Sequence, residues 1–171
     1  MTAQNRHLKG DMNAIKMDVR GKTVIEAGDF VYRHSGDSYY LYPFSSQKAM
    51  STTGACLVDI ATNFMGVAME SSPSGVTEKI TVATSGIFRY PLVWKSAVTV
   101  GAVVTAVSPH ASGSGVSNQY VANSTDLATS STTVYLGKIV RTDTSAVSFV
   151  DFSLITLVSS VTYNWAGNIN V

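Results

Sequence analysis

The chain is poor in charged residues, and this scarcity narrows the classes of partner. Asp, Glu, Lys and Arg make up 13% of the 171 residues, which is about half the usual share. The formal net charge is +1, so the sequence has no excess of basic residues for binding nucleic acid or an acidic membrane surface. Because free monomers are usually kept soluble by surface charge, a chain this neutral favours a protein that is docked in an assembly.

Cysteine and long apolar runs are also scarce. The single cysteine, Cys56, excludes a disulfide within these residues and a cysteine metal cluster. Its small apolar neighbours in "GACLV" indicate a buried core thiol. No apolar run approaches the roughly 18 residues of a membrane-spanning helix, and residues 1–22 lack the apolar core of a signal peptide. We therefore expect a protein that is made in the cytoplasm and has no membrane partner.

No catalytic or metal-binding pattern stands out. The three histidines, His7, His34 and His110, lie in polar or turn-like contexts. His34 is near Asp29 and Asp37 in the sequence, but nothing shows the spacing of metal ligands, so an exposed loop histidine is favoured. The eleven acidic residues are dispersed, and no nucleophile, base and orienting group can be assembled from the sequence. We expect a protein that is not an enzyme, with no catalytic residue, cofactor or metal.

From Lys22 onward the chain has the composition of β-strands. Short runs rich in Val, Ile, Thr, Phe and Tyr alternate with turn residues, as in "KTVIEAGDFVYRHSGDSYYLYP" and "KITVATSGIFRYPLVW". The pattern predicts an all-β protein, with a small β-barrel or β-tulip-like domain over residues 22–171. The segment "SSQKAMSTTGACLVDIATNF" is less β-like and predicts a short helix or a loop insertion. Over residues 147–152 the alternation leaves open which set faces the core, because Asp151 interrupts one apolar set.

The first residues differ from the rest and predict an extended N-terminal arm over residues 1–21. Leu8, Met12, Ile15 and Met17 have neither clean helical nor clean strand spacing. A first strand that pairs at the edge of a sheet is the alternative, and the two interpretations are compatible. We expect these four apolar residues to contact another subunit or a partner protein.

Aromatic residues supply the other candidate contacts. Trp94 and Trp165, with the cluster of Tyr39, Tyr40 and Tyr42, are residue types that stack on sugars. Such residues more often belong to a core or a subunit interface, and we favour that interpretation. Trp94 and Trp165 therefore join the apolar residues of the arm as candidate interface residues.

Two glycine motifs recur along the chain. "AGDFV" at residues 27–31 is similar in form to "VGAVV" at residues 100–104, and "FMGVA" at residues 64–68 is similar to "YLGKIV" at residues 135–140. The recurrence predicts an internal duplication. Glycine at such points allows a bulge or a positive φ angle where a strand bends around a small barrel.

The order of these motifs resembles a known family. The series Ala27–Val31, Gly66–Ala68, Val82–Phe88, Val100–Val104 and Gly137–Val140 is similar to the phage head-decoration (capsid cement) proteins of the DUF2190-like type. These are similar in style to the lambda-type capsid decoration proteins. The match spans residues 24–158, although the second glycine motif lacks the Asp that follows Gly28 in the first.

The resemblance implies a non-enzymatic protein of the virion that binds the outer surface of the assembled capsid. It implies the major capsid protein as partner, self-association as a homotrimer, and an N-terminal arm that adds a strand to a capsid protein. Deleting residues 1–20 is then expected to weaken attachment while the β domain stays folded. The alternative is a carbohydrate- or receptor-binding β module, such as a fibre or knob protein of the virion.

Overall fold

The computed structural model describes residues 6–9, 12–49, 53–74, 78–107, 116–123, 134–141 and 147–156. Within these ranges the chain forms eleven β-strands, one α-helix and one 3-10 helix. The elements in chain order are β1 (Arg6–Lys9), β2 (Ala14–Val19), β3 (Phe30–His34), β4 (Asp37–Pro43), the 3-10 helix η1 (Phe44–Ala49), α1 (Thr53–Asn63), β5 (Phe64–Ala68), β6 (Glu78–Ala83), β7 (Ile87–Ser96), β8 (Val103–Ala106), β9 (Val121–Asn123), β10 (Tyr135–Arg141) and β11 (Val147–Leu154).

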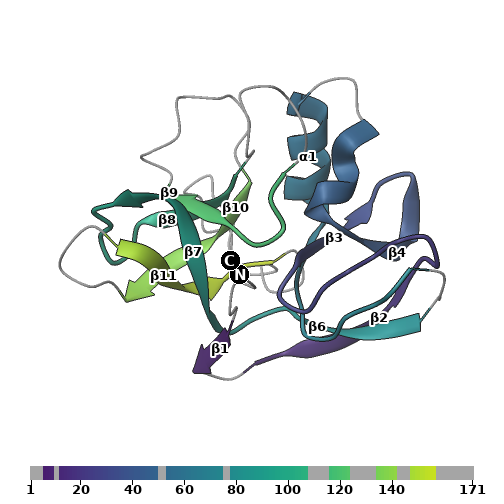
Figure 1. The fold of residues 1–171 in the computed structure, drawn as a ribbon, viewed down its shortest axis with the longest axis horizontal. Coiled ribbons are helices and arrows are strands. Elements are labelled where there is room, and N and C mark those ends of the chain that lie inside the picture. The colour runs from purple at the N-terminus through teal and green to yellow at the C-terminus, as the bar shows by residue number, and fades with distance from the viewer. Residues whose placement is uncertain are drawn as a thin grey trace, which may run out of the picture.

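The strands form two barrels that lie side by side (Figure 1). The first barrel closes in the order β2-β4-β3-β5-β6, and the second in the order β7-β11-β10-β8-β9 through the pairing of β7 with β9. The predicted all-β, small-barrel class is confirmed. There are two barrels instead of one, and the first of them includes β2, which precedes residue 22. Strand periodicity shows where strands lie, whereas barrel closure depends on pairings between residues far apart in the sequence.

The two barrels have the same strand order. Strands β2 to β6 of the first barrel correspond in sequence to β7 to β11 of the second, and each neighbouring pair in one barrel has its counterpart in the other. Each barrel has one parallel pair, between its first and third strands, which places Val19 opposite Leu41 and Leu92 opposite Val121. Among the described strands the remaining barrel pairs are antiparallel.

The registers agree residue for residue at the glycine motifs. Val31 of β3 pairs with Gly66 of β5, and Val104 of β8 pairs with Gly137 of β10. Both ladders shift register beside this pair, as at a β-bulge. The internal duplication predicted from the recurring motifs is therefore confirmed.

Both glycines are required because a neighbouring strand passes too close for a side chain. A Cβ on Gly66 would collide with the carbonyl oxygen of Ala83, and a Cβ on Gly137 would collide with the carbonyl oxygen of Ser153. Ala83 and Ser153 occupy equivalent places in β6 and β11, since each lies opposite the residue that follows the glycine. Both barrels therefore have the same close approach between neighbouring strands.

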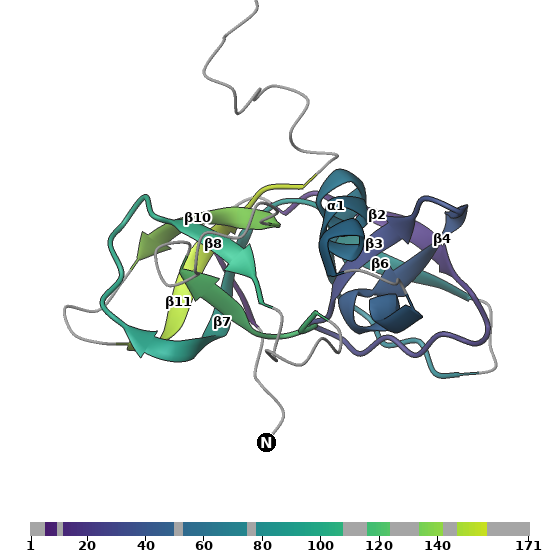
Figure 2. The same cartoon turned by 90° about the horizontal axis from the view of Figure 1, so that it is seen from above.

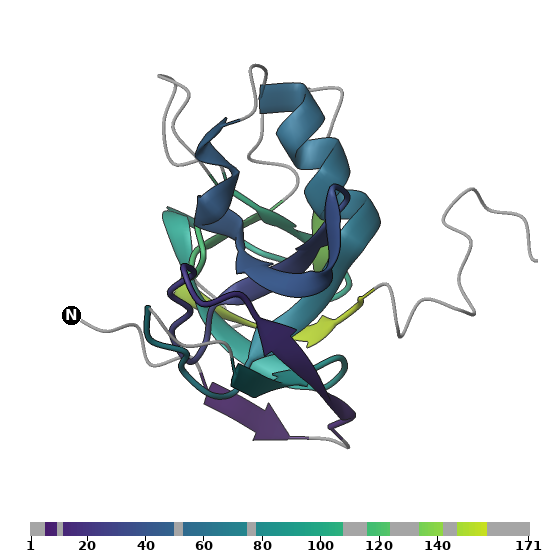
Figure 3. The same ribbon diagram turned by 90° about the vertical axis from the view of Figure 1, so that its right-hand side faces the viewer.

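Residues along β3 alternate between two cores. Val31 points into the first barrel, while Phe30 and Tyr32 belong to a larger cluster that also holds residues of α1 and of the second barrel. Phe30 stacks on Tyr90 of β7 with ring centroids 4.5 Å apart. Helix α1 packs against β3 at the side of the first barrel that faces the second (Figure 2), and Figure 3 shows α1 and η1 above the strands of the first barrel. The barrels therefore meet through apolar side chains.

The segment assigned to an N-terminal arm contains two strands. β2 belongs to the first barrel, where all its residues pair with β6, and β1 pairs with the start of β7 in the second barrel. Along β2, Ile15, Met17 and Val19 form the inward-facing set, and Val19 is completely buried. The alternative of a first strand that pairs in a sheet therefore describes this segment, and the body of the fold begins before residue 22.

The structure shows which of the two alternating sets of side chains in β11 faces the core. Val150, Phe152 and Leu154 are buried in the interior. Asp151 points to the other face, where Arg89 donates hydrogen bonds from Nε to Oδ1 at 2.7 Å and from Nη2 to Oδ2 at 2.9 Å. The acidic residue is thus paired across the β7–β11 ladder instead of lying inside the barrel.

Candidate functional site

An open pocket of about 900 Å³ lies on the first barrel. It is formed where the segment after β2 passes the β3–β4 hairpin and the start of η1. Its lining combines cationic, aromatic and hydroxyl side chains, namely Arg20, Lys22, Thr23, Val24, Tyr32, His34, Gly36, Asp37, Tyr42, Pro43, Ser45 and Ser46.

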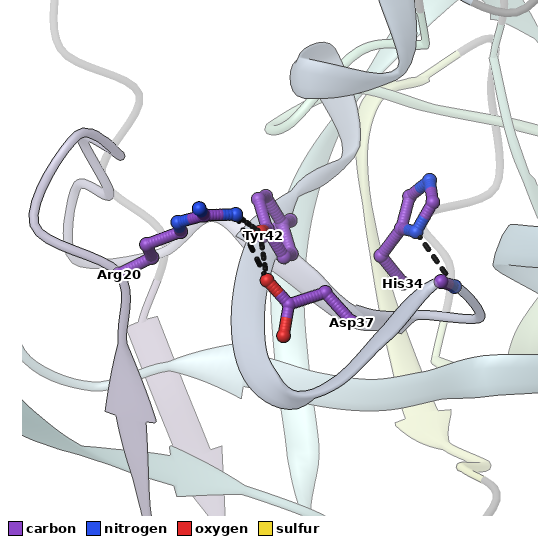
Figure 4. Close-up of polar contacts among 5 residues, drawn as sticks. Arg20, His34, Asp37 and Tyr42 are labelled. Carbon is purple, nitrogen blue, oxygen red and sulfur yellow. Dashed lines mark hydrogen bonds and ion pairs between the residues drawn. The ribbon is translucent and has the colours of Figure 1, made fainter.

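Arg20, Asp37 and Tyr42 form a connected polar group in this pocket (Figure 4). Nη1 of Arg20 donates to Oδ2 of Asp37 at 3.0 Å and to the Tyr42 hydroxyl at 3.4 Å, and the Tyr42 hydroxyl donates to the same carboxylate oxygen at 3.0 Å. The hydrogen bond and the electrostatic interaction with Tyr42, followed by the charge of Asp37, raise the pKa of Arg20. Because the Arg20 side chain is 57% exposed, its guanidinium remains accessible to an incoming group.

His34 forms part of the pocket wall. Its Nδ1 accepts a hydrogen bond of 2.9 Å from the main-chain N–H of Gly36, and its ring meets Tyr42 edge to face with centroids 5.9 Å apart. Nδ1 is bonded to the main chain of the turn, and the ring packs against Tyr42. His34 therefore contributes an aromatic ring to the wall of the pocket. Within the part of the chain that the structure describes, no group of three His, Cys, Asp or Glu side chains is placed to hold a metal ion.

Asp29 lies at the junction of the two barrels instead of joining His34 and Asp37. The residue is only 3% exposed. Oδ2 accepts from the main-chain N–H of Glu26 at 2.9 Å, and Oδ1 accepts from the side-chain amide of Gln119 at 2.8 Å. Burial raises the pKa of Asp29, and these two hydrogen bonds offset part of the rise. A second, smaller pocket of about 400 Å³ opens beside Asp29 between the barrels.

Asn118 connects three parts of this junction. Its side-chain amide donates to Asp29 Oδ2 at 3.4 Å and to the Ser45 hydroxyl at 3.1 Å, and its side-chain oxygen accepts from the Ser45 N–H at 2.7 Å. The main-chain oxygen of Asn118 accepts from the N–H of Phe30 at 2.9 Å. No sequence motif marks Asn118 or Gln119, because their role depends on a contact with residues about half a chain away.

The structure describes the side chains of three of the six residues predicted as contacts. Met12 is exposed, and Ile15 and Met17 are partly buried against the core of the first barrel. Leu8 lies in β1 and Trp94 in β7, but the description of these strands does not include the two side chains. Trp165 lies outside the described residues.

The three tyrosines of the sequence cluster also differ in their surroundings. Tyr42 lines the pocket, and Tyr32, which sequence reasoning did not single out, lies beside it. Tyr40 is half-buried, while the side chain of Tyr39 lies outside the description. In this pocket the Arg20 cation, the ring of Tyr42 and the serine hydroxyls could recognise a polar group on a ligand, whereas Tyr32 is fully buried.

Comparison with models of known protein families gives no match for this chain, and comparison with characterised protein sequences gives none either. Among the helices in the described ranges, none has the length and apolar character needed to cross a membrane.

Proposed function

We propose that this chain is a viral structural protein that binds the outer surface of a bacteriophage capsid and stabilises the head. Its partner is the major capsid protein, its working form is a homotrimer, and its location is the virion. The protein acts by binding and catalyses no reaction.

The ordered series of glycine motifs carries this proposal. Residues 27–31 and 66–68 belong to the first barrel, and residues 100–104 and 137–140 to the second. The motifs on which the resemblance to head-decoration proteins rests therefore lie at equivalent points of a duplicated fold. The resemblance therefore rests on motifs that occupy defined places in the fold, and this supports the proposal.

The surface and the rigidity of the molecule also support the proposal. The barrels are joined by a buried carboxylate and stacked aromatic rings, so the pair can present one fixed, broad face. With only 13% charged residues, such a face can be covered by a partner without removing water from many ions. Many copies that each hold neighbouring capsid subunits would strengthen the shell through multivalency.

Co-sedimentation with capsids tests this function. The purified chain is mixed with expanded capsids of the phage that encodes it and, in parallel, with unexpanded proheads. We expect saturable binding to expanded capsids and an increase in the temperature at which they release their genome. A chain that is folded by circular dichroism and stays in the supernatant with expanded capsids would contradict the proposal.

Recognition of a carbohydrate or receptor is the second candidate, and the pocket beside Tyr42 favours it. An aromatic ring with adjacent hydroxyl and guanidinium groups is suited to stacking on a sugar and bonding its hydroxyls. A glycan array with the purified chain tests this function, followed by the Tyr42→Ala variant for any glycan that binds. Tyr120→Ala is the matched control, because Tyr120 is 45% exposed and does not line this pocket. Binding that Tyr42→Ala abolishes and Tyr120→Ala retains would favour this candidate.

A further inference from the structure

We propose that the pocket on the first barrel binds an acidic sugar, whose carboxylate is held by Arg20 and Lys22. This inference rests on the second candidate function, carbohydrate recognition, and names the class of saccharide that the pocket takes. Three observations carry it: the charges of the pocket, the hydrogen-bond donors that its lining leaves unused, and the position of the acidic residues beside it.

The lining of the pocket carries more positive than negative charge. Arg20 and Lys22 lie two residues apart in the segment after β2, and both are exposed. Asp37 is the one carboxylate in the described lining, and it is already paired with Arg20 at 3.0 Å. Lys22 forms no ion pair with any residue that the structure describes. The charge of Lys22 is therefore left for a ligand.

Asp37 orients the Arg20 side chain and leaves most of its donors unused. Nη1 of Arg20 is turned toward Tyr42 and Asp37 (Figure 4), and it makes both hydrogen bonds of this side chain to described residues. A guanidinium carries five N–H donors in a rigid fork that matches a carboxylate. Because the side chain is 57% exposed, Nε and Nη2 of Arg20 remain available to a carboxylate on a ligand.

The neutral groups of the lining also favour a ligand rich in acceptors. Nδ1 of His34 accepts from the Gly36 N–H at 2.9 Å, so the neutral ring carries its proton on Nε2 and donates from there. The Ser45 hydroxyl accepts from the Asn118 amide at 3.1 Å, and its own proton is donated to no residue that the structure describes. A carboxylate has only acceptor sites, so it complements these donors.

Acidic residues beside the pocket indicate where the ligand carboxylate lies. The smaller pocket at the barrel junction shares Val24 and Ser45 with the larger one and is also lined by Glu26 and Asp29. Glu26 is exposed, and its charge repels a carboxylate from that end. The carboxylate is therefore expected at the end formed by Arg20 and Lys22.

The size of the pocket and the position of Tyr42 indicate that the carboxylate is carried on a sugar ring. A volume of about 900 Å³ is that of a site for a small organic ligand and far exceeds the size of a bare inorganic anion. The hydroxyl of Tyr42 lies 3.4 Å from Nη1 of Arg20, so an aromatic ring stands next to the cation. Aromatic rings pack against the apolar faces of sugars, and the serine hydroxyls can bond the hydroxyls of a sugar.

Titration calorimetry with two matched disaccharides tests the proposal. Cellobiuronic acid and cellobiose share one scaffold, and the first has a carboxylate where the second has a hydroxymethyl group. We expect the natural chain to bind the acid about tenfold more tightly, and Lys22→Gln to lose most of this preference. Lys79→Gln is the matched control, because Lys79 is exposed on β6 and does not line the pocket. Equal affinity for the two disaccharides, or an equal loss in the two variants, would overturn the proposal.

NMR on the unmodified chain provides a second test that depends on no variant. The signal of the Arg20 Nε–H group should shift on addition of cellobiuronic acid and shift less with cellobiose. Acetate and sulfate are added separately at the same concentration and should leave this signal in place. If either anion reproduces the shift, the pocket is a site for any small anion and the assignment to an acidic sugar is wrong.

The outcomes distinguish this inference from the functions proposed above. If the chain binds neutral glycans on the array and shows no preference for cellobiuronic acid, carbohydrate recognition stands and the acidic ligand is wrong. If it binds neither disaccharide and no glycan on the array, both fail. Co-sedimentation with expanded capsids tests capsid binding separately, whichever of these results is found.

Discussion

Asp29 of the first barrel accepts a hydrogen bond of 2.8 Å from the side-chain amide of Gln119 in the second barrel. The two residues are 90 positions apart in the chain, and each lies in the segment just before a barrel strand. The contact has no counterpart within the duplication, because the residue equivalent to Asp29 is Ala102. It therefore belongs to the joining of the two barrels and not to the barrel fold itself.

Removing the amide of Gln119 should destabilise the whole chain. In Gln119→Ala, the buried carboxylate of Asp29 loses a donor, and we expect the free energy of unfolding to fall by about 1–2 kcal/mol. Urea denaturation followed by tryptophan fluorescence and by circular dichroism measures this loss. Val100→Ala is the control, because Val100 is 60% exposed and its truncation should leave stability unchanged. A Gln119→Ala variant as stable as the control would contradict the role given to this bond.

Asp29 should also make stability depend on pH in a particular direction. Burial raises the pKa of Asp29 in the folded chain above its value in the unfolded chain, so the folded chain holds this proton more tightly. The stability that protonation contributes is fully present below the unfolded pKa and is lost as pH rises through the folded pKa. The unfolding free energy of the natural chain should therefore fall relative to that of Asp29→Asn as pH rises. Unfolding of both chains from pH 3 upward measures this difference. A difference that is constant with pH would exclude the raised pKa.

The hydroxyl of Tyr90 provides an independent test of the junction. It is completely buried and donates a hydrogen bond of 2.6 Å to the carbonyl oxygen of Gly28. Tyr90→Phe keeps the ring that stacks on Phe30 and removes this bond, so we expect a loss of about 1–2 kcal/mol in unfolding free energy. Tyr120→Phe, at an exposed tyrosine, should cost nothing measurable. Equal stabilities for the two variants would show that the bond to Gly28 contributes nothing.

Both equivalent glycines should resist substitution, and Gly66, which has a φ of 143°, should resist it more strongly than Gly137. Gly66→Ala and Gly137→Ala each force a Cβ against a carbonyl oxygen, and we expect each to lower the free energy of unfolding by about 2–3 kcal/mol. At Gly101, which has a φ of 88°, an added Cβ meets nothing within 4 Å. Gly101→Ala should therefore cost only the backbone strain, about 1 kcal/mol. Thermal denaturation of the three variants would contradict this account if Gly101→Ala were the least stable.

Local features of the fold could be predicted from the sequence because glycine and β-branched residues mark them directly. The recurring glycine motifs predicted a duplication, and the register of Val31 with Gly66 and of Val104 with Gly137 confirms it. The helix α1 also lies in the one segment that was not β-like. Barrel closure could not be predicted, since strand patterns do not show which strands pair.

The candidate site was mostly beyond sequence reasoning. Arg20 meets Asp37 only because β2 runs parallel to β4, and Asp29 meets Gln119 only because the two barrels pack together. Asp29 is near His34 and Asp37 in the sequence, but the structure directs its side chain to the junction of the barrels.

The position of β2 also changes how attachment must be tested. Deleting residues 1–20 would remove a strand whose residues all pair with β6, so that variant is now expected to open the first barrel. Substitutions of exposed residues that leave β2 paired with β6 keep the barrel closed and separate attachment from folding.

Electron cryomicroscopy of expanded capsids, imaged with and without the purified chain, tests the central claim most directly. Capsid decoration predicts added density on the outer surface, at local threefold positions, into which the two-barrel fold can be placed. Capsids that remain bare at saturating concentrations of folded protein would contradict the account.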